Sequence, residues 1–148
     1  MQIERLAGPD FADWAPLWKA YLTFYKADLP ESTTELTFRR LIDPNEPTMG
    51  GFIAREITGA ARGIVHWMDH RSCWTPGDYC YLQDLFVAGQ VRGKGLGTAL
   101  IDAVANDARL RGCSRVYWIT HETNTVAQSL YHKVAEASGF IQFVKKLG

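Results

Sequence analysis

The spacing of apolar residues along the chain predicts an alternation of strands and helices. Apolar residues recur every three or four positions from Phe11 to Tyr25 and from Leu96 to Ala108, which is typical of helices that bury one face. The segment from Tyr79 to Val87 is mostly apolar on both of its faces, which is typical of a strand inside a sheet. We therefore expect strands over residues 3–6, 51–56, 61–69, 79–87, 116–120 and 140–146, and helices over residues 11–25, 32–42, 96–108 and 124–138.

The order of these elements defines the expected fold class. It is β-α-α-β-β-β-α-β-α-β, which predicts an α/β protein with a mixed sheet. The chain has 148 residues, of which 47% are hydrophobic. This length suits one domain, residues 1–148, with a core large enough to fold without disulfides.

Charge and hydropathy exclude several classes of protein. The 16 basic and 16 acidic side chains balance, whereas a nucleic-acid binder usually shows a basic excess. No apolar run approaches the roughly 18 residues of a membrane span. The first residues, Met1 to Arg5, do not resemble a signal peptide. We expect neither a nucleic acid nor a membrane as partner.

The cysteines and histidines indicate no metal site. Cys73, Cys80 and Cys113 form no C-x-x-C pair, so we expect reduced thiols in a cytoplasmic protein. His66 and His70 fall on one predicted strand, where they would lie about 13 Å apart, too far to share an ion.

A glycine-rich turn between the strand 79–87 and the next helix is the most informative stretch. Its three glycines alternate along the chain, so backbone N–H groups are free of neighbouring side chains and open to an anion. The helix that follows adds free N–H groups and the positive end of its dipole. A phosphate-bearing ligand fits this turn better than no ligand. Arg92 and Lys94 supply full positive charges in this stretch, which consists of Gln90, Val91, Arg92, Gly93, Lys94, Gly95, Leu96, Gly97 and Thr98.

Two well-known phosphate loops do not match this stretch. A Walker A loop places its lysine after the second glycine, whereas Lys94 precedes Gly95. The dinucleotide fingerprint G-x-G-x-x-G fails because Thr98 occupies its last position.

The chain resembles the GCN5-related N-acetyltransferase (GNAT) family in two motifs. Gln90, Gly93 and Gly95 match the family's [Gln/Arg]-x-x-Gly-x-[Gly/Ala] between a strand and a helix. The block from Asn124 to Tyr131 is similar to N-x-x-A-x-x-L-Y. The two motifs occur in the family's order and on the expected elements, and the resemblance covers about half the chain, from Tyr79 to Phe140.

The resemblance implies a mostly antiparallel sheet, acetyl-CoA as the acetyl donor and no metal. By this analogy, the coenzyme's pyrophosphate lies on the turn 92–98 and its pantetheine arm runs beside Leu85, Phe86 and Val87. Asn124 and Ala127 would lie along the same arm, with Tyr131 near the thioester sulfur.

The residue types present suit acyl transfer to an amine. An alkyl ammonium group has a pKa near ~10.4, so it must lose a proton before it attacks. A backbone N–H of the strand 79–87 can polarise the thioester carbonyl. A tyrosine hydroxyl can protonate the departing thiolate, which makes Tyr131 a catalytic candidate. The alternative for Tyr131 is packing on the core.

The general base is less defined by the sequence. Similar proteins that act on polyamines often carry Glu-Asp on this strand, where this chain has Gln83-Asp84. A glutamine amide cannot accept the proton, and strand alternation directs Asp84 to the opposite face. Asp84 is the candidate base. The alternatives are that Asp84 is a structural carboxylate, that the proton is removed through water, or that His121 or Glu122 takes it.

After Tyr131 the chain carries four more residues before Gly139-Phe140 than many family members do. This looks like the histone and polyamine acetyltransferase branch, with a longer helix before the last strand. That strand, 140–146, is expected to pair within one subunit or between two, and we expect a homodimer.

These features together predict an acetyl-CoA-dependent N-acetyltransferase that moves acetyl directly to a primary amine. The acceptor is a small, polyamine-like amine or a lysine side chain. The alternative is a non-catalytic acyl-CoA sensor, which Gln83 favours and Tyr131 opposes. A nucleotide-binding module is a third possibility.

Overall fold

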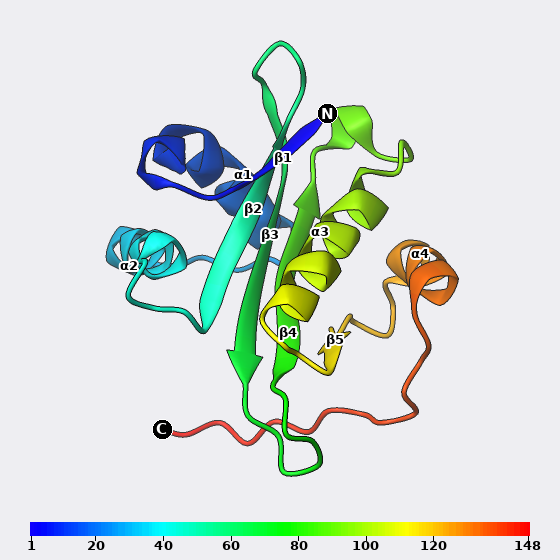
Figure 1. The fold of residues 1–148 in the computed structure, drawn as a ribbon. Helices are drawn as coiled ribbons and strands as arrows, with labels where there is room; N and C mark the ends of the chain where they lie inside the picture. The colour runs from blue at the N-terminus through cyan, green and yellow to red at the C-terminus, as the bar shows by residue number, and fades with distance from the viewer.

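Five strands form one mixed sheet in the order β1-β2-β3-β4-β5 (Figure 1). The structure, a computed structural model, describes residues 1–148. The first three strand pairs are antiparallel, and β4 and β5 are parallel. The strands are β1 Gln2–Arg5, β2 Met49–Arg55, β3 Ala61–His70, β4 Tyr79–Val87 and β5 Arg115–Tyr117.

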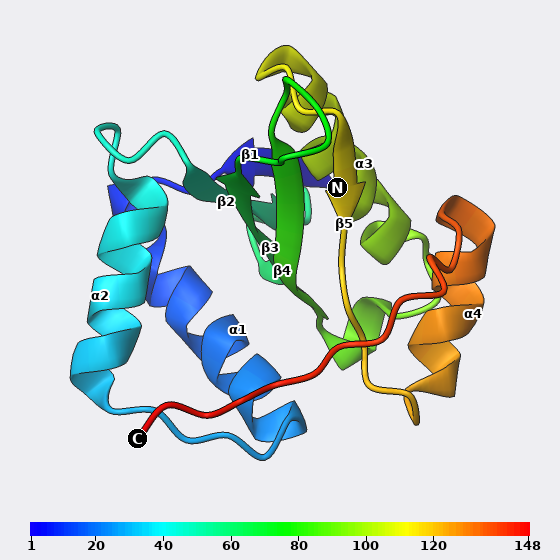
Figure 2. The ribbon, with the colours of Figure 1, turned by 90° about the horizontal axis from the view of Figure 1, so that it is seen from below.

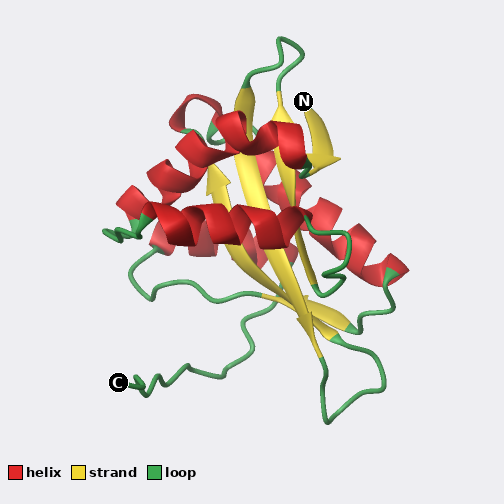
Figure 3. Ribbon diagram, turned by 90° about the vertical axis from the view of Figure 1, so that its left-hand side faces the viewer, coloured by secondary structure: helices red, strands yellow, loops and turns green.

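Helices cover both faces of this sheet. One face carries α1 (Phe11–Phe24) and α2 (Glu31–Ile42), and the other carries α3 (Leu96–Leu110) and α4 (Thr125–Val134) (Figure 2). Figure 3 shows the first two helices lying across the strands. None of these helices combines the length and the apolar character that crossing a bilayer requires. The architecture confirms the predicted single-domain α/β fold.

The core lies on both sides of β3. On one side, the Trp14 ring of α1 packs 5.0 Å from the Phe38 ring of α2. On the other, Leu100 and Val104 of α3 are fully buried. A Cβ added at Gly63 would lie 3.0 Å from Leu100 Cδ1, so α3 approaches β3 closely. This packing anchors the start of α3 against the middle of the sheet.

Two irregularities of β4 shape its surroundings. His66 pairs with Asp84 and the next residue, Trp67, pairs with Leu82, so Gln83 has no partner on β3 and forms a β-bulge. The second irregularity is that β5 pairs with β4 only from Tyr79 to Tyr81. Beyond Tyr81, the chain after β5 leads away to α4 (Figure 2). One edge of β4 is therefore without a strand partner along its second half.

The end of the chain differs from the prediction. The helix predicted over 124–138 ends at Val134, and Ala135 is extended. The residues after Val134 are exposed, so continuing the helix would bury no apolar face. The predicted strand 140–146 does not form, and the segment passes below the sheet in the view of Figure 1. Its apolar pattern resembles a strand, but a strand also requires a neighbour to pair with. The predicted strand 116–120 is likewise shorter, ending at Tyr117.

Candidate active site

The glycine turn forms the start of α3, as predicted. Gly93 and Gly95 have φ angles of +79° and +83°, in the left-handed region that favours glycine. Gly95 is the N-cap of α3, and no side chain caps the helix start. The N–H groups of the first turn therefore have no intrahelical acceptor and remain available to an anion. Leu96 is buried, so it can offer an anion only its backbone N–H.

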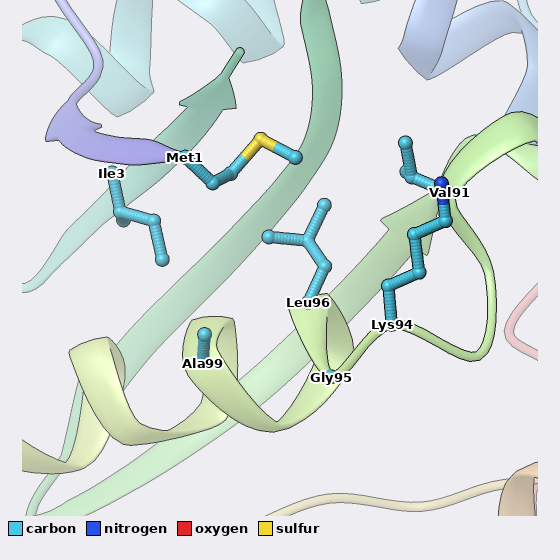
Figure 4. Close-up of a pocket in the computed structure, with 7 residues that line it drawn as sticks. All are labelled: Met1, Ile3, Val91, Lys94, Gly95, Leu96 and Ala99. Atoms are coloured by element: carbon cyan, nitrogen blue, oxygen red, sulfur yellow. The ribbon is translucent and has the colours of Figure 1, made fainter. Parts of the chain in front are cut away.

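The two basic side chains of the turn flank this helix start. The Arg92 Nε donates to the Val87 carbonyl at 3.1 Å, which ties the turn to the end of β4. The Lys94 side chain points toward Val91, at a hollow beside the beginning of α3 (Figure 4). Both cations belong to the turn that immediately precedes the uncapped N–H groups, and their charge adds to the attraction for an anion.

The second motif is brought against the first by close helix packing. A Cβ added at Gly97 would lie 3.2 Å from Leu130 Cδ2, so Gly97 allows α4 to approach α3. From the sequence, Gly97 is expected among the phosphate-binding residues, and its packing role appears only in the structure. At the start of α4, the Asn124 side chain accepts a hydrogen bond from the Ala127 N–H at 3.4 Å and caps the helix. The two motifs are therefore neighbours.

A groove lies between the unpaired edge of β4, α1 and α4. The Tyr131 ring packs edge-to-face on Trp118 with centroids 5.5 Å apart. Burial, followed by the nearby Tyr25, raises the pKa of Tyr131, so its hydroxyl keeps its proton and can donate it. The residues that line the groove are Tyr21, Tyr25, Leu82, Gln83, Leu85, Trp118, Ile119 and Tyr131.

Asp84 lies at the α1 side of this groove, held by a buried histidine. The His66 Nδ1 is 2.9 Å from Asp84 Oδ2, and the Asp84 side chain is 13% exposed. Burial first, and then the charge and hydrogen bonding of Asp84, raise the pKa of Tyr21 well above its usual range. Burial and the Asp84 charge also raise the pKa values of Tyr25 and Tyr81. A carboxylate surrounded by neutral phenols is a suitable setting for a cationic amine.

Sequence reasoning missed three of these side chains as site residues. The sequence argues against a metal ion shared by His66 and His70 and assigns His66 no catalytic role. In the structure, Trp14 Nε1 and Asp84 Oδ2 each contact one of its ring nitrogens. Tyr21 and Tyr25 fall on the helix predicted over residues 11–25, and in the structure both line the groove. The signal for Tyr21 and Tyr25 in the sequence is their helical spacing after Trp14. This spacing does not show which other elements face the two side chains.

The two other proposed bases have different surroundings. His121 and Glu122 are exposed in the loop before α4. The His121 Nδ1 accepts the Thr123 N–H at 3.2 Å, and the Glu122 carbonyl accepts from the Gln128 amide at 3.0 Å. Neither side chain is held by a buried partner as Asp84 is.

Comparison with known proteins gives this fold and site a class. The acetyltransferase (GNAT) family model matches residues 14–135. A D-amino-acid N-acetyltransferase of Saccharomyces cerevisiae is 36% identical over 133 residues, covering 90% of this chain and 83% of the relative. A thialysine N-epsilon-acetyltransferase of Mus musculus is 36% identical over 77 residues, covering 49% of this chain and 45% of the relative.

Solved structures agree on the fold. The aminoglycoside N-acetyltransferase AAC(6')-Iy, solved with CoA, superposes with a TM-score of 0.85 at 19% identity, covering 98% of this chain and 93% of that one. A ribosomal-protein-alanine N-acetyltransferase from Brucella melitensis gives a TM-score of 0.79 at 24% identity, covering 99% of this chain and 100% of that one.

The fold and the family match together define an N-acetyltransferase. The chain belongs to the acetyltransferase (GNAT) family, as its two motifs predicted.

Proposed function

We propose that this protein transfers an acetyl group from acetyl-CoA directly to a primary amine of a small molecule. The observation that carries this proposal is the groove that Tyr131 lines together with the unpaired edge of β4, with Asp84 at its α1 side. The relatives' names refer to acetylation of D-amino acids and of thialysine, which are small amines. A lysine side chain of a peptide is the other acceptor of matching chemistry.

The coenzyme's site is proposed from the elements that surround the groove. The diphosphate binds the uncapped N–H groups at the start of α3, between Arg92 and Thr98, with Gln90 beside them. The pantetheine amides bind the free edge of β4 at Leu85, Phe86 and Val87, in the manner of an added strand. Asn124 and Ala127 border this arm from α4.

The reaction proceeds by direct attack. The acceptor enters as an ammonium ion attracted by Asp84, which takes a proton and leaves a neutral amine. The amine nitrogen attacks the thioester carbonyl, and a free N–H of β4 stabilises the oxyanion. The carbon–sulfur bond then breaks, and Tyr131 gives its proton to the thiolate. The amine's second proton returns to the tyrosine oxygen through solvent, and Asp84 releases the first proton to solvent before the next cycle.

Two measurements together test the proposed function. Release of free CoA thiol is followed over a panel of D-amino acids, diamines and a lysine peptide, and binding of acetyl-CoA is measured by calorimetry. We expect binding, and thiol release that depends on at least one amine. Binding without thiol release for every acceptor would instead indicate a sensor, and comparable affinity for ATP would indicate a nucleotide-binding module.

We also propose that the protein forms a homodimer in the cytoplasm. The segment after α4 exposes large apolar side chains, with Phe143 88% exposed, and such a patch favours association. The three cysteines are free, which suits a reducing compartment. Sedimentation is expected to show a dimer that Phe143→Glu converts to monomer. A monomeric wild-type protein would contradict the dimer.

A further inference from the structure

A chain of hydrogen bonds links the middle of the core to the groove. The Trp14 Nε1 lies 2.9 Å from His66 Nε2, and the His66 Nδ1 lies 2.9 Å from Asp84 Oδ2. Trp14 has no exposed surface and His66 is 1% exposed. The three residues come from α1, β3 and β4, so only the folded chain assembles them.

The partners of His66 determine which of its nitrogens carries the proton. An indole N–H can only donate, so the Nε2 of His66 must accept from Trp14. The hydrogen of a neutral imidazole then resides on Nδ1, which donates to Asp84. His66 is therefore a neutral donor to the carboxylate, and Trp14 selects this tautomer.

Packing holds the imidazole in this orientation. The Trp14 and Trp18 rings stack with centroids 5.6 Å apart, and both lie against the His66 ring, at 5.8 Å and 5.3 Å. Because His66 is buried against both rings, its ring cannot rotate without displacing core side chains. The β-bulge at Gln83 is adjacent, so the paired residues His66 and Asp84 lie where β4 leaves its regular ladder.

We propose that His66 is a positioning residue for Asp84, orienting the carboxylate that takes the proton of the amine. This inference rests on the proposed function, in which Asp84 is the base. When Asp84 gains the proton it becomes a neutral carboxylic acid. Its Oδ2 continues to accept the His66 hydrogen bond, so His66 itself neither gains nor loses a proton. Trp14 acts indirectly, because its indole N–H fixes the tautomer of His66.

Two substitutions at His66 separate orientation from packing. His66→Phe keeps a planar ring and removes the donor, and misorientation of a reacting group lowers kcat by up to about 100-fold. His66→Asn places an amide N–H where Nδ1 lies, and we expect its kcat to recover to within about fivefold of wild type. The KM for acetyl-CoA should stay within about twofold in both, because its binding elements lie on α3 and β4. Equal losses in both variants would overturn the proposal.

Trp14→Phe provides a second measurement if His66→Phe does not fold. It keeps the aromatic packing and removes the indole N–H, so kcat should fall by about three- to tenfold with unchanged KM for acetyl-CoA. Wild-type turnover in a folded Trp14→Phe variant would overturn the role of the tautomer.

Asp84→Asn, alone and combined with His66→Phe, distinguishes this inference from the proposed function. The double variant should be no slower than Asp84→Asn, because His66 acts through Asp84. Multiplying losses would overturn the positioning role. Wild-type turnover in Asp84→Asn would overturn the proposed base itself, whereas a slow Asp84→Asn with a fast His66→Phe would overturn only the positioning role.

Discussion

Asp84 and Gln83 are neighbours on β4 with different surroundings. Asp84 pairs with His66 and is largely buried, whereas Gln83 occupies the bulge and is exposed. In a regular strand, two consecutive side chains lie on opposite faces of the sheet. The bulge interrupts this alternation. As a result, β4 presents both the Asp84 carboxylate, which is held by His66, and Gln83, which lines the groove.

We expect Asp84→Asn to lower kcat by about 100-fold or more, because an amide cannot accept the amine's proton. Steady-state kinetics at saturating acetyl-CoA measures this loss, and thermal unfolding reports on the fold. Asp102→Asn, on the exposed side of α3, is the matched control and should behave as wild type. A wild-type rate in Asp84→Asn would remove this residue from the mechanism.

Tyr131 is the other residue whose surroundings suit its proposed role. Because its pKa is raised, the Tyr131 hydroxyl keeps its proton above pH 10, where an ordinary tyrosine loses it. A proton donor of this kind stays in its active form as pH rises. The decline of kcat caused by loss of this proton is therefore expected only above about pH 10.

Tyr131→Phe should lower kcat by about 100-fold, since the thiolate then leaves without a proton donor. The rate of thiol release measures the loss. Tyr117→Phe serves as control, because the Tyr117 hydroxyl bonds to His70 outside the groove, at 2.7 Å. If Tyr131→Phe retained full turnover, the leaving group would need another acid.

At the scale of elements, the start of α3 depends on backbone conformation. Gly95 has a left-handed φ, while a Cβ at Gly95 or at Gly89 would meet no atom within 4 Å. Steric crowding therefore does not distinguish the two positions, and only the φ angle does. Any effect specific to Gly95 reports on the geometry of the helix N-terminus.

Gly95→Ala should reduce the free energy of unfolding by about 1 kcal/mol, because alanine is strained at this φ. We also expect the KM for acetyl-CoA to rise about tenfold as the first N–H groups of α3 shift. Urea unfolding and kinetics check these effects, with Gly89→Ala as the unstrained control. Similar results for both variants would show that the left-handed φ is unimportant.

At the scale of the whole molecule, a buried thiol links stability to pH. Cys80 is fully buried on β4, and burial, followed by the Asp69 charge, raises its pKa from 9.0 to about 12. Above pH 9 the unfolded thiol loses its proton while the folded thiol keeps it. The folded state then binds more protons, so stability falls as pH rises from about 9 to about 12.

Cys80→Ala should flatten this pH dependence, whatever it does to the stability at neutral pH. The wild-type free energy of unfolding should fall by up to about 1.4 kcal/mol per pH unit through Cys80. Urea unfolding between about pH 8.5 and pH 9.5, where unfolded tyrosines with a pKa near ~10 are still mostly protonated, measures the slope. Cys73→Ser, at an exposed cysteine, should leave the slope unchanged. Parallel slopes in wild type and Cys80→Ala would contradict the linkage.

The amino-acid sequence by itself determined the element order as far as α4, the glycine turn and the position of Tyr131. These features depend on local periodicity and on contiguous motifs, which survive without knowledge of the neighbours. The strand predicted over 140–146 was wrong because its apolar pattern cannot show whether a partner strand is present.

Only the tertiary structure decided the rest of the site. The bulge at Gln83, the divergence of β5 from β4 and the contact between Gly97 and Leu130 arise where separate elements meet. Trp14, His66 and Asp84 lie 52 and 18 residues apart along the chain. No local pattern encodes such contacts, because each hydrogen bond requires a backbone geometry that exists only after the sheet and α1 have packed together.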